Sequence, residues 1–184
     1  MPFSFLGKTL SGCFTVPSGI VTTAPSIIQR VIRDMPEIGV ITTKSIGLEP
    51  RLGNREPVYS QFAPGCFVNA VGLTNPGAQG SLESLGQLCV PDDRFLLVSI
   101  FGGSVEEFVA VAKMLEPVAD GFELNLSCPH ASGYGMAMGQ DPSIVGEIVA
   151  AVKQAVSKPV IPKLTPNVAH IAEIGQAALD AGAD

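Results

Sequence analysis

Apolar, β-branched runs alternate with stretches of helical periodicity along most of the chain. The apolar runs predict strands, and the periodic stretches between them predict helices, which together form successive βα units around a parallel sheet. The predicted strands span 15–21, 39–45, 95–100, 122–127 and 160–165, and the predicted helices span 25–35, 105–118, 142–156 and 169–181. Asp141 is a suitable N-cap and Gly182 a suitable C-terminal stop. Residues 3–14 predict a small hairpin that turns at Gly7-Lys8 or at Ser11-Gly12.

The stretch 46–78 breaks this rhythm, because prolines and glycines recur through it. Such residues favour turns, and a loop of this length inside a compact domain is usually functional or disordered. The interleaved apolar residues favour an ordered, packed excursion; they are Val58, Phe62, Phe67, Val68, Val71 and Leu73. No linker, repeat or low-complexity tract divides the chain, which predicts a single domain over 1–184.

The predicted fold class is α/β, with five βα units that fit the first five-eighths of a (β/α)8 TIM barrel. A doubly wound sheet is the competing architecture, but no G-x-G-x-x-G follows the first predicted strand. A complete barrel needs about 250 residues. The sequence stops at Ala183-Asp184, where a sixth strand is expected to begin, so we interpret it as a truncated or split barrel.

Composition narrows the function classes. The net charge of −6 argues against nucleic acid as a partner, because phosphate binding needs clustered Lys and Arg. No apolar run is long enough for a membrane span, and the N-terminus has no export signal. Four cysteines stand far apart without a C-x-x-C pair, which favours neither a zinc site nor a disulfide framework and indicates a reducing cytoplasm.

In a parallel barrel, the C-terminal strand ends face one side, and active sites lie there. The polar or small residues at these predicted ends are Ser18, Gly19, Lys44, Ser45, Ser99, Asn125, Ser127, Lys163 and Thr165. A lysine at such a position is partly desolvated and needs an anionic or carbonyl partner. For Lys44 and Lys163 this partner is either a ligand or, in the simpler interpretation, the carboxylate of Glu49 or Asp120. Because both lysines converge on one face, the ligand is favoured.

The motif Asn125-Leu126-Ser127-Cys128-Pro129-His130 follows an apolar strand and precedes a Gly- and Met-rich loop. A thiol at a strand end is placed for chemistry, although free cysteines are often buried and inert. His130 is a candidate general acid or base, a ligand donor, or a loop hydrogen-bonding residue.

Five motifs in order resemble the class 1 dihydroorotate dehydrogenases, FMN-dependent (β/α)8 barrel enzymes, over essentially all 184 residues. They are T-K-S at 43–45, E-P-R-x-G-N at 49–54, N-A-V-G-L-T-N-P-G at 69–77, N-L-S-C-P at 125–129 and K-L-T-P-N at 163–167. The resemblance implies oxidation of dihydroorotate to orotate in pyrimidine biosynthesis.

The resemblance also implies a role for individual residues. Cys128 matches the base that takes the C5 proton of dihydroorotate while hydride passes from C6 to flavin N5. The other implied substrate-binding residues are Lys44, Asn69, Val71, Gly72, Leu73, Asn125 and His130. The implied cofactor-binding residues are Ser18, Gly19, Lys44, Ser45, Asn125 and Lys163, the two lysines lying beside the isoalloxazine. No metal-binding residues are implied.

The sequence departs from this family at His130, where dihydroorotate dehydrogenases commonly carry a substrate-binding Asn. The flavin domain of dihydropyrimidine dehydrogenases also reads N-L-S-C-P-H, which keeps reduction of uracil or thymine as an alternative function. The loop 135–142 resembles the type that pairs with a subunit carrying FAD and an iron–sulfur cluster, with NAD as distant acceptor, rather than the fumarate-using type. A homo-oligomer is also expected.

The part of the barrel that follows in the family carries glycine-rich loops for the FMN phosphate, the usual site after strands seven and eight. Without them we expect the isolated 184 residues to bind FMN weakly or not at all. A third hypothesis is therefore a non-catalytic half-barrel that folds by association, because its open strand edges are templates for pairing.

Overall fold

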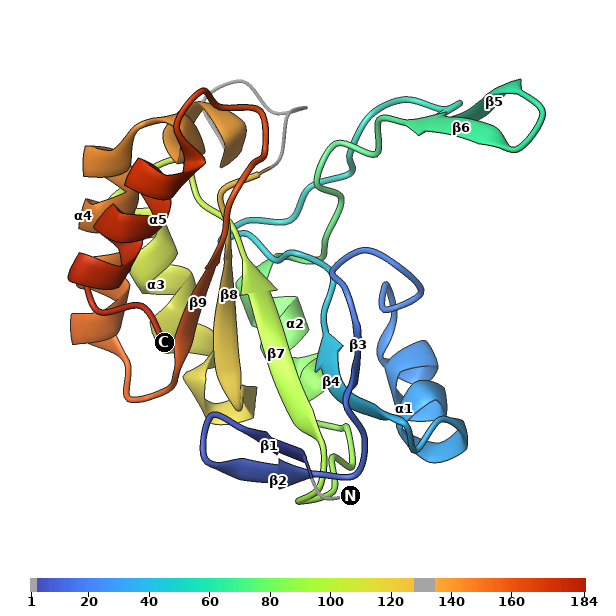
Figure 1. The fold of residues 1–184 in the computed structure, drawn as a ribbon. Helices are drawn as coiled ribbons and strands as arrows, with labels where there is room; N and C mark the ends of the chain where they lie inside the picture. The colour runs from blue at the N-terminus through green and yellow to red at the C-terminus, as the bar shows by residue number, and fades with distance from the viewer. Residues whose placement is uncertain (1–2, 128–134) are drawn as a thin grey trace.

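The computed structural model describes residues 3–127 and 135–184. Its centre is a five-stranded sheet in the order β3-β4-β7-β8-β9, with every neighbouring pair parallel. The strands are β3 (Phe14–Val16), β4 (Ile38–Thr42), β7 (Phe95–Ile100), β8 (Gly121–Asn125) and β9 (Val160–Lys163). The sheet curves as a half-barrel with its helices on one face, which confirms the α/β partial-barrel prediction over the doubly wound alternative (Figure 1).

In the described part of the chain, five α-helices lie around the outside of the sheet (Figure 1). They are α1 (Pro25–Asp34), α2 (Gly77–Leu85), α3 (Val105–Leu115), α4 (Pro142–Ala155) and α5 (Ile171–Asp180), and a 3-10 turn, η1 (Glu116–Val118), extends α3. The predicted cap is confirmed, because the Asp141 side chain accepts hydrogen bonds from the backbone N–H of Ser143 and Ile144. Gly182 is left-handed with φ 91°, as the predicted helix stop requires.

The two faces of the sheet bury different clusters, because side chains alternate along a strand. On β7, Leu96, Val98 and Ile100 belong to the large core beneath the helices. Phe95 and Leu97 belong to a smaller cluster on the inner face, together with Leu10, Val40, Phe5 and Ile161. The inner face is therefore apolar at its N-terminal end, where β1 and β2 cover it.

β1 (Phe3–Phe5) and β2 (Lys8–Leu10) form the predicted antiparallel hairpin below the sheet (Figure 1). The turn lies at Leu6-Gly7, with φ 46° and 81°, which is one residue before the predicted Gly7-Lys8 and away from Ser11-Gly12. Gly7 accounts for this, since a two-residue hairpin turn needs positive φ at its central positions. Phe5 packs edge-on against Phe95 with 5.2 Å between ring centroids.

The segment 46–78 differs most from its prediction. It is ordered, but it contains the hairpin β5 (Tyr59–Ala63) and β6 (Cys66–Asn69), which stands away from the sheet (Figure 1). Phe62 and Phe67 on this hairpin are 70% and 51% exposed, so the prediction that they pack is wrong. Leu73 is buried as predicted. Helix α2 begins at Gly77, inside the end of this segment, and the sequence pattern does not predict it.

The remaining boundaries differ modestly. The first predicted strand, 15–21, is strand only to Val16, and Ser18 and Gly19 lie in the loop that follows β3. The second ends at Thr42, so Lys44 and Ser45 also lie beyond their strand. Within the described ranges, no helix combines the length and apolar character that a membrane crossing requires.

The inner apolar cluster generates a stability prediction. Phe95→Ala removes a ring that is 2% exposed and opens a cavity between Phe5 and the sheet, so we expect a loss of about 3–5 kcal/mol in the free energy of unfolding. Urea denaturation followed by circular dichroism measures this. The control is Phe62→Ala on the exposed hairpin, which we expect to change the free energy of unfolding far less. Equal losses in both variants would contradict the packing argument.

Candidate functional site

The C-terminal ends of the central strands carry a connected cluster of polar side chains on the inner face. Ser45 Oγ lies 3.1 Å from Ser18 Oγ and 2.9 Å from Ser99 Oγ, and it accepts a 2.8 Å hydrogen bond from Asn125 Nδ2. Ser99 Oγ donates to Glu123 Oε1 at 2.7 Å. We call these residues, together with Lys163, the strand-end cluster. Each parallel strand, or the loop directly after it, supplies at least one member.

The direction of the hydroxyl chain follows from counting protons. A serine hydroxyl carries one proton. Ser99 donates its proton to Glu123, so Ser45 must be the donor toward Ser99. The proton of Ser45 is then used, and Ser18 is the donor toward Ser45. The chain therefore runs Ser18 to Ser45 to Ser99 to the Glu123 carboxylate, with Asn125 as a side branch.

Lys163 ends β9 and donates to the same oxygen of Glu123, at 2.7 Å. The Lys163 side chain is 35% exposed and that of Glu123 is 10% exposed, so the pair reaches from the buried sheet toward solvent. The simpler interpretation of Lys163 expected Glu49 or Asp120 as its partner, whereas the partner is Glu123. Asp120 directly precedes β8, at the opposite end from the cluster, and pairs with Lys8 at 3.0 Å.

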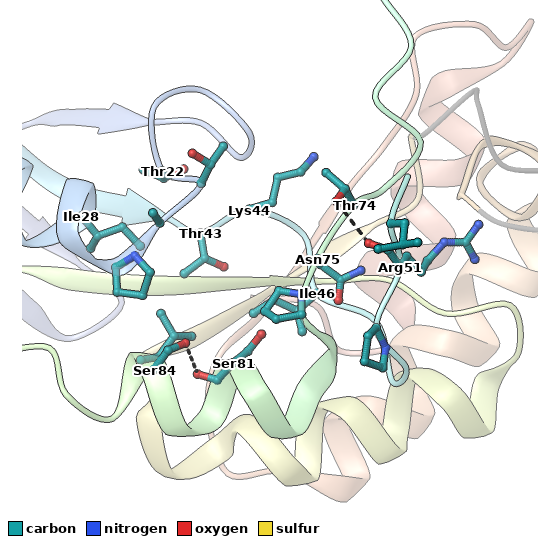
Figure 2. A pocket seen from close by; sticks show the side chains of 17 residues that line it. Thr22, Ile28, Thr43, Lys44, Ile46, Arg51, Thr74, Asn75, Ser81 and Ser84 are labelled. Carbon is teal, nitrogen blue, oxygen red and sulfur yellow. Dashed lines mark hydrogen bonds between the residues drawn. The ribbon is translucent and has the colours of Figure 1, made fainter. Parts of the chain in front are cut away.

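Lys44 and Gly19 lie beside each other at the rim of the cluster. A Cβ built on Gly19 would stand 3.8 Å from Lys44 Nζ. Lys44 also lines a cavity of about 470 Å³ between α1, α2 and the loops at 50–52 and 74–76. Figure 2 shows Ser81 and Ser84 of α2 on one side of this cavity and Thr22 and Lys44 on the other. Among the predicted site residues that the structure describes, only Lys44 lines it, so the cavity adjoins the strand-end cluster without containing it.

Predicted residues 69 and 71–73 form a separate group on the arm that carries β5 and β6. Asn69 is exposed and pairs with Tyr59 in the hairpin. Gly72 and Leu73 have φ of 82° and 57°, and a Cβ on Gly72 would come within 2.7 Å of the Asn54 side chain. Asn54 N donates to Val71 O at 3.0 Å. The structure holds 71–73 against 51–54, and no hydrogen bond found among the described residues links the group to the strand-end cluster.

The motif at 125–130 is described only as far as Ser127; Cys128 and His130 lie outside the described residues. Asn125 Oδ1 accepts hydrogen bonds from Ser127 N and Ser127 Oγ, at 3.2 and 3.0 Å. The 3-10 turn η2 (Gly135–Gln140) returns to this strand end, because a Cβ on Gly139 would overlap the carbonyl of Leu126. Asn125 is thus fixed from both of its polar ends.

Glu123 is the member of the cluster that the sequence did not predict. It stands in an apolar strand run, and the sequence around it does not indicate which residue its charge would pair with. The available signal was its spacing: Glu123 and Asn125 are two residues apart, so they share a face of the strand. Among the residues that the structure describes, no group of His, Cys, Asp and Glu is arranged to hold a metal ion.

Comparison with known proteins gives a consistent result. A family model described as dihydroorotate dehydrogenase matches residues 2–184. Three similar curated proteins are each named dihydroorotate dehydrogenase B (NAD(+)), catalytic subunit. The Pyrococcus horikoshii protein is 50% identical over 170 residues, covering 91% of this chain and 54% of the relative. The Pyrococcus furiosus protein is 46% identical over 178 residues, covering 97% of this chain and 58% of the relative. The Methanocaldococcus jannaschii protein is 44% identical over 170 residues, covering 91% of this chain and 55% of the relative. This chain therefore spans a little over half the length of these relatives.

The position of Ser45 generates a prediction about the cluster. Ser45→Ala removes the acceptor of Asn125 Nδ2 and breaks the chain between Ser18 and Ser99. Because buried donors then lack partners, we expect the free energy of unfolding to fall by about 1–3 kcal/mol. Urea denaturation measures the change, with Ser60→Ala on the exposed hairpin as the control. Indistinguishable unfolding curves for the two variants would show that the cluster contributes nothing to stability.

The arm generates a second prediction, at Gly72. An alanine there meets both a left-handed backbone and the close Asn54 side chain, so we expect Gly72→Ala to destabilise the protein by about 1–2 kcal/mol or more. Gly65→Ala, at φ 74° with open space around it, isolates the backbone contribution. A loss at Gly72 no larger than the loss at Gly65 would contradict the tight packing of 72 on 54.

Proposed function

Because this chain belongs to the dihydroorotate dehydrogenase family, we propose that its protein oxidises dihydroorotate to orotate in pyrimidine biosynthesis. The observation that supports this best is the family match over residues 2–184, which includes every member of the strand-end cluster. The names of the relatives extend the proposal to the catalytic subunit of an NAD-linked enzyme. The proposed protein is one barrel domain, of which residues 1–184 form the first five βα units.

The strand-end cluster suits FMN as the cofactor. Its donors include the Lys163 ammonium and the Asn125 amide, and Lys44 stands at its rim. A cation beside the pyrimidine edge of a flavin stabilises the reduced, anionic form. We assign FMN binding to Ser18, Gly19, Lys44, Ser45, Asn125 and Lys163. Bound FMN would accept hydride from C6 of the substrate.

The remaining proposed residues act on the substrate. Cys128 takes the proton from C5, and loss of this proton and of the C6 hydride leaves the C5–C6 double bond of orotate. Asn69 and Asn125 hold the pyrimidine ring through their amides. Lys44, together with the backbone of 71–73, binds the carboxylate, since an ammonium and N–H groups are charge-assisted donors to an anion.

The proposed partners follow from the NAD-linked type. An electron-transfer subunit with FAD and an iron–sulfur cluster would reoxidise the flavin, and the catalytic subunit would form a homo-oligomer in the cytoplasm. The second candidate function is reduction of uracil or thymine, as in dihydropyrimidine dehydrogenases. His130 within N-L-S-C-P-H is the observation that favours it.

Substrate choice separates the two functions. We expect the complete protein, saturated with FMN, to have its flavin bleached by dihydroorotate and not by dihydrouracil under anaerobic conditions. Flavin absorbance followed by stopped flow measures both reactions. Bleaching by dihydrouracil alone would overturn the proposed function in favour of the second candidate.

The role of Cys128 generates a kinetic prediction. We expect Cys128→Ser to bind FMN normally but to be reduced by dihydroorotate about a hundredfold more slowly or worse, because a hydroxyl is a much weaker base than a thiolate. Cys66→Ser, at an exposed thiol on β6, is the matched control and should react like the wild type. A Cys128→Ser variant with wild-type reduction kinetics would remove Cys128 from the base role.

A further inference from the structure

Glu123 places a negative charge at a strand end where the proposed ligands, a reduced flavin and a carboxylate substrate, are themselves anionic. Glu123 is only 8% exposed, and burial of a carboxylate is costly unless the carboxylate is paired and hydrogen-bonded. Oε1 meets this requirement with two short bonds, from Lys163 Nζ and Ser99 Oγ. Both donors come from the strands that flank β8.

We propose that Glu123 is the positioning residue of the strand-end cluster: it holds the Lys163 ammonium and sets the donor direction of the serine chain. This inference rests on the proposed function for its consequences at the flavin. Its structural part, the anchoring of Lys163, concerns the chain alone and is tested without any cofactor.

The anchoring follows from the strand register. Asn125 is the register partner of Lys163, and Ile161 is the partner of Glu123. The Lys163 side chain therefore turns back by two residues along the sheet to reach Glu123. An ammonium has three N–H donors, so the bond to Glu123 leaves donors for a ligand while it fixes the position of Nζ.

The donor direction has a chemical consequence at Ser18. Because the carboxylate only accepts hydrogen bonds, every hydroxyl of the chain donates toward it. Ser18 has thus given its proton to Ser45, and it offers lone pairs to anything bound above it. The cluster presents an acceptor at the β3 end and a cation at the β9 end. An amide N–H and an anionic oxygen of one planar ligand match this polarity.

The charge of the pair has a consequence for the redox equilibrium. Glu123 compensates the positive charge of Lys163, so the site stabilises a reduced, anionic flavin less than an uncompensated lysine would. Removing the negative charge while keeping the shape should favour reduction, because charges near the ring tune its potential. Glu123→Gln makes this change and keeps an oxygen that accepts from Ser99 and Lys163.

The experiment has a flavin-free part and a flavin part, both on the complete protein. Acetic anhydride labelling, quantified by mass spectrometry, gives the reactivity of Lys163 relative to the exposed Lys113. We expect Glu123→Gln to raise the relative reactivity of Lys163 about two- to fivefold, because a neutral amide binds an ammonium less firmly than a carboxylate does. In the FMN-loaded protein we expect the equilibrium constant for two-electron reduction of the flavin to rise at least about tenfold. This corresponds to a reduction potential that is more positive by about 30 mV.

Glu147→Gln is the matched control, since it removes the same charge from an exposed position on α4. Unchanged labelling of Lys163 in Glu123→Gln relative to this control would overturn the anchoring role. Increased labelling with an unchanged potential would overturn the role at the flavin. A wild type that binds no FMN would refute the proposed function, while the labelling result still decides the anchoring. If Glu123→Gln does not fold, Glu123→Asp replaces it, because the shorter carboxylate should also release Lys163.

Discussion

The hydrogen-bond chain that ends on Glu123 connects the proposed cofactor-binding residues to the sheet. Its members come from the loop after β3, the loop after β4, and strands β7, β8 and β9. Their side chains meet only while the parallel register is kept, since a shift of one residue would turn each group to the opposite face. The register is in turn fixed by the helices, which bury the alternate residues of the same strands. Core packing on the outer face therefore positions chemistry on the inner face.

Much of this arrangement could be predicted from the sequence, because strand ends of a parallel sheet gather on one side. Ser18, Ser45, Asn125 and Lys163 were singled out on that argument and lie within one connected cluster. Glu123 could not be assigned in the same way. Its partner is 40 residues away on the next strand, and no local pattern records a pairing over that distance. The roles of all these residues stay predictions, as do those of Cys128 and His130.

The missed elements have local causes. Helix α2 contains two glycines and has no side-chain cap, so its intrinsic propensity is low, and tertiary bonds such as Ala78 N to Leu48 O hold its start. The β5–β6 hairpin turns at Pro64-Gly65, with Gly65 at φ 74°, which is the chemistry of a type II turn. In the sequence these turn residues indicate a loop, although here they connect two strands. Two aromatic side chains of the hairpin, Tyr59 and Phe67, stack on each other instead of entering the core.

The strand-end cluster and the group at 71–73 are held in place by different parts of the structure. The strand-end cluster is held by the parallel ladder and by the buried core beneath it. The group at 71–73 depends on local hydrogen bonds of the Asn75 side chain. Asn75 Oδ1 accepts from the backbone N–H of Gly47 and Gly77, and Asn75 Nδ2 donates to Leu73 O. The proposed cofactor contacts, and the proposed substrate contact of Asn125, would thus be set by the sheet, whereas the substrate contacts of 71–73 would be set by a loop that is fixed at its base. Because the Asn75 side chain joins the loop after β4 to the start of α2, it helps to fix the position of the arm relative to the barrel, together with the backbone pairing of Arg51 with Asn75.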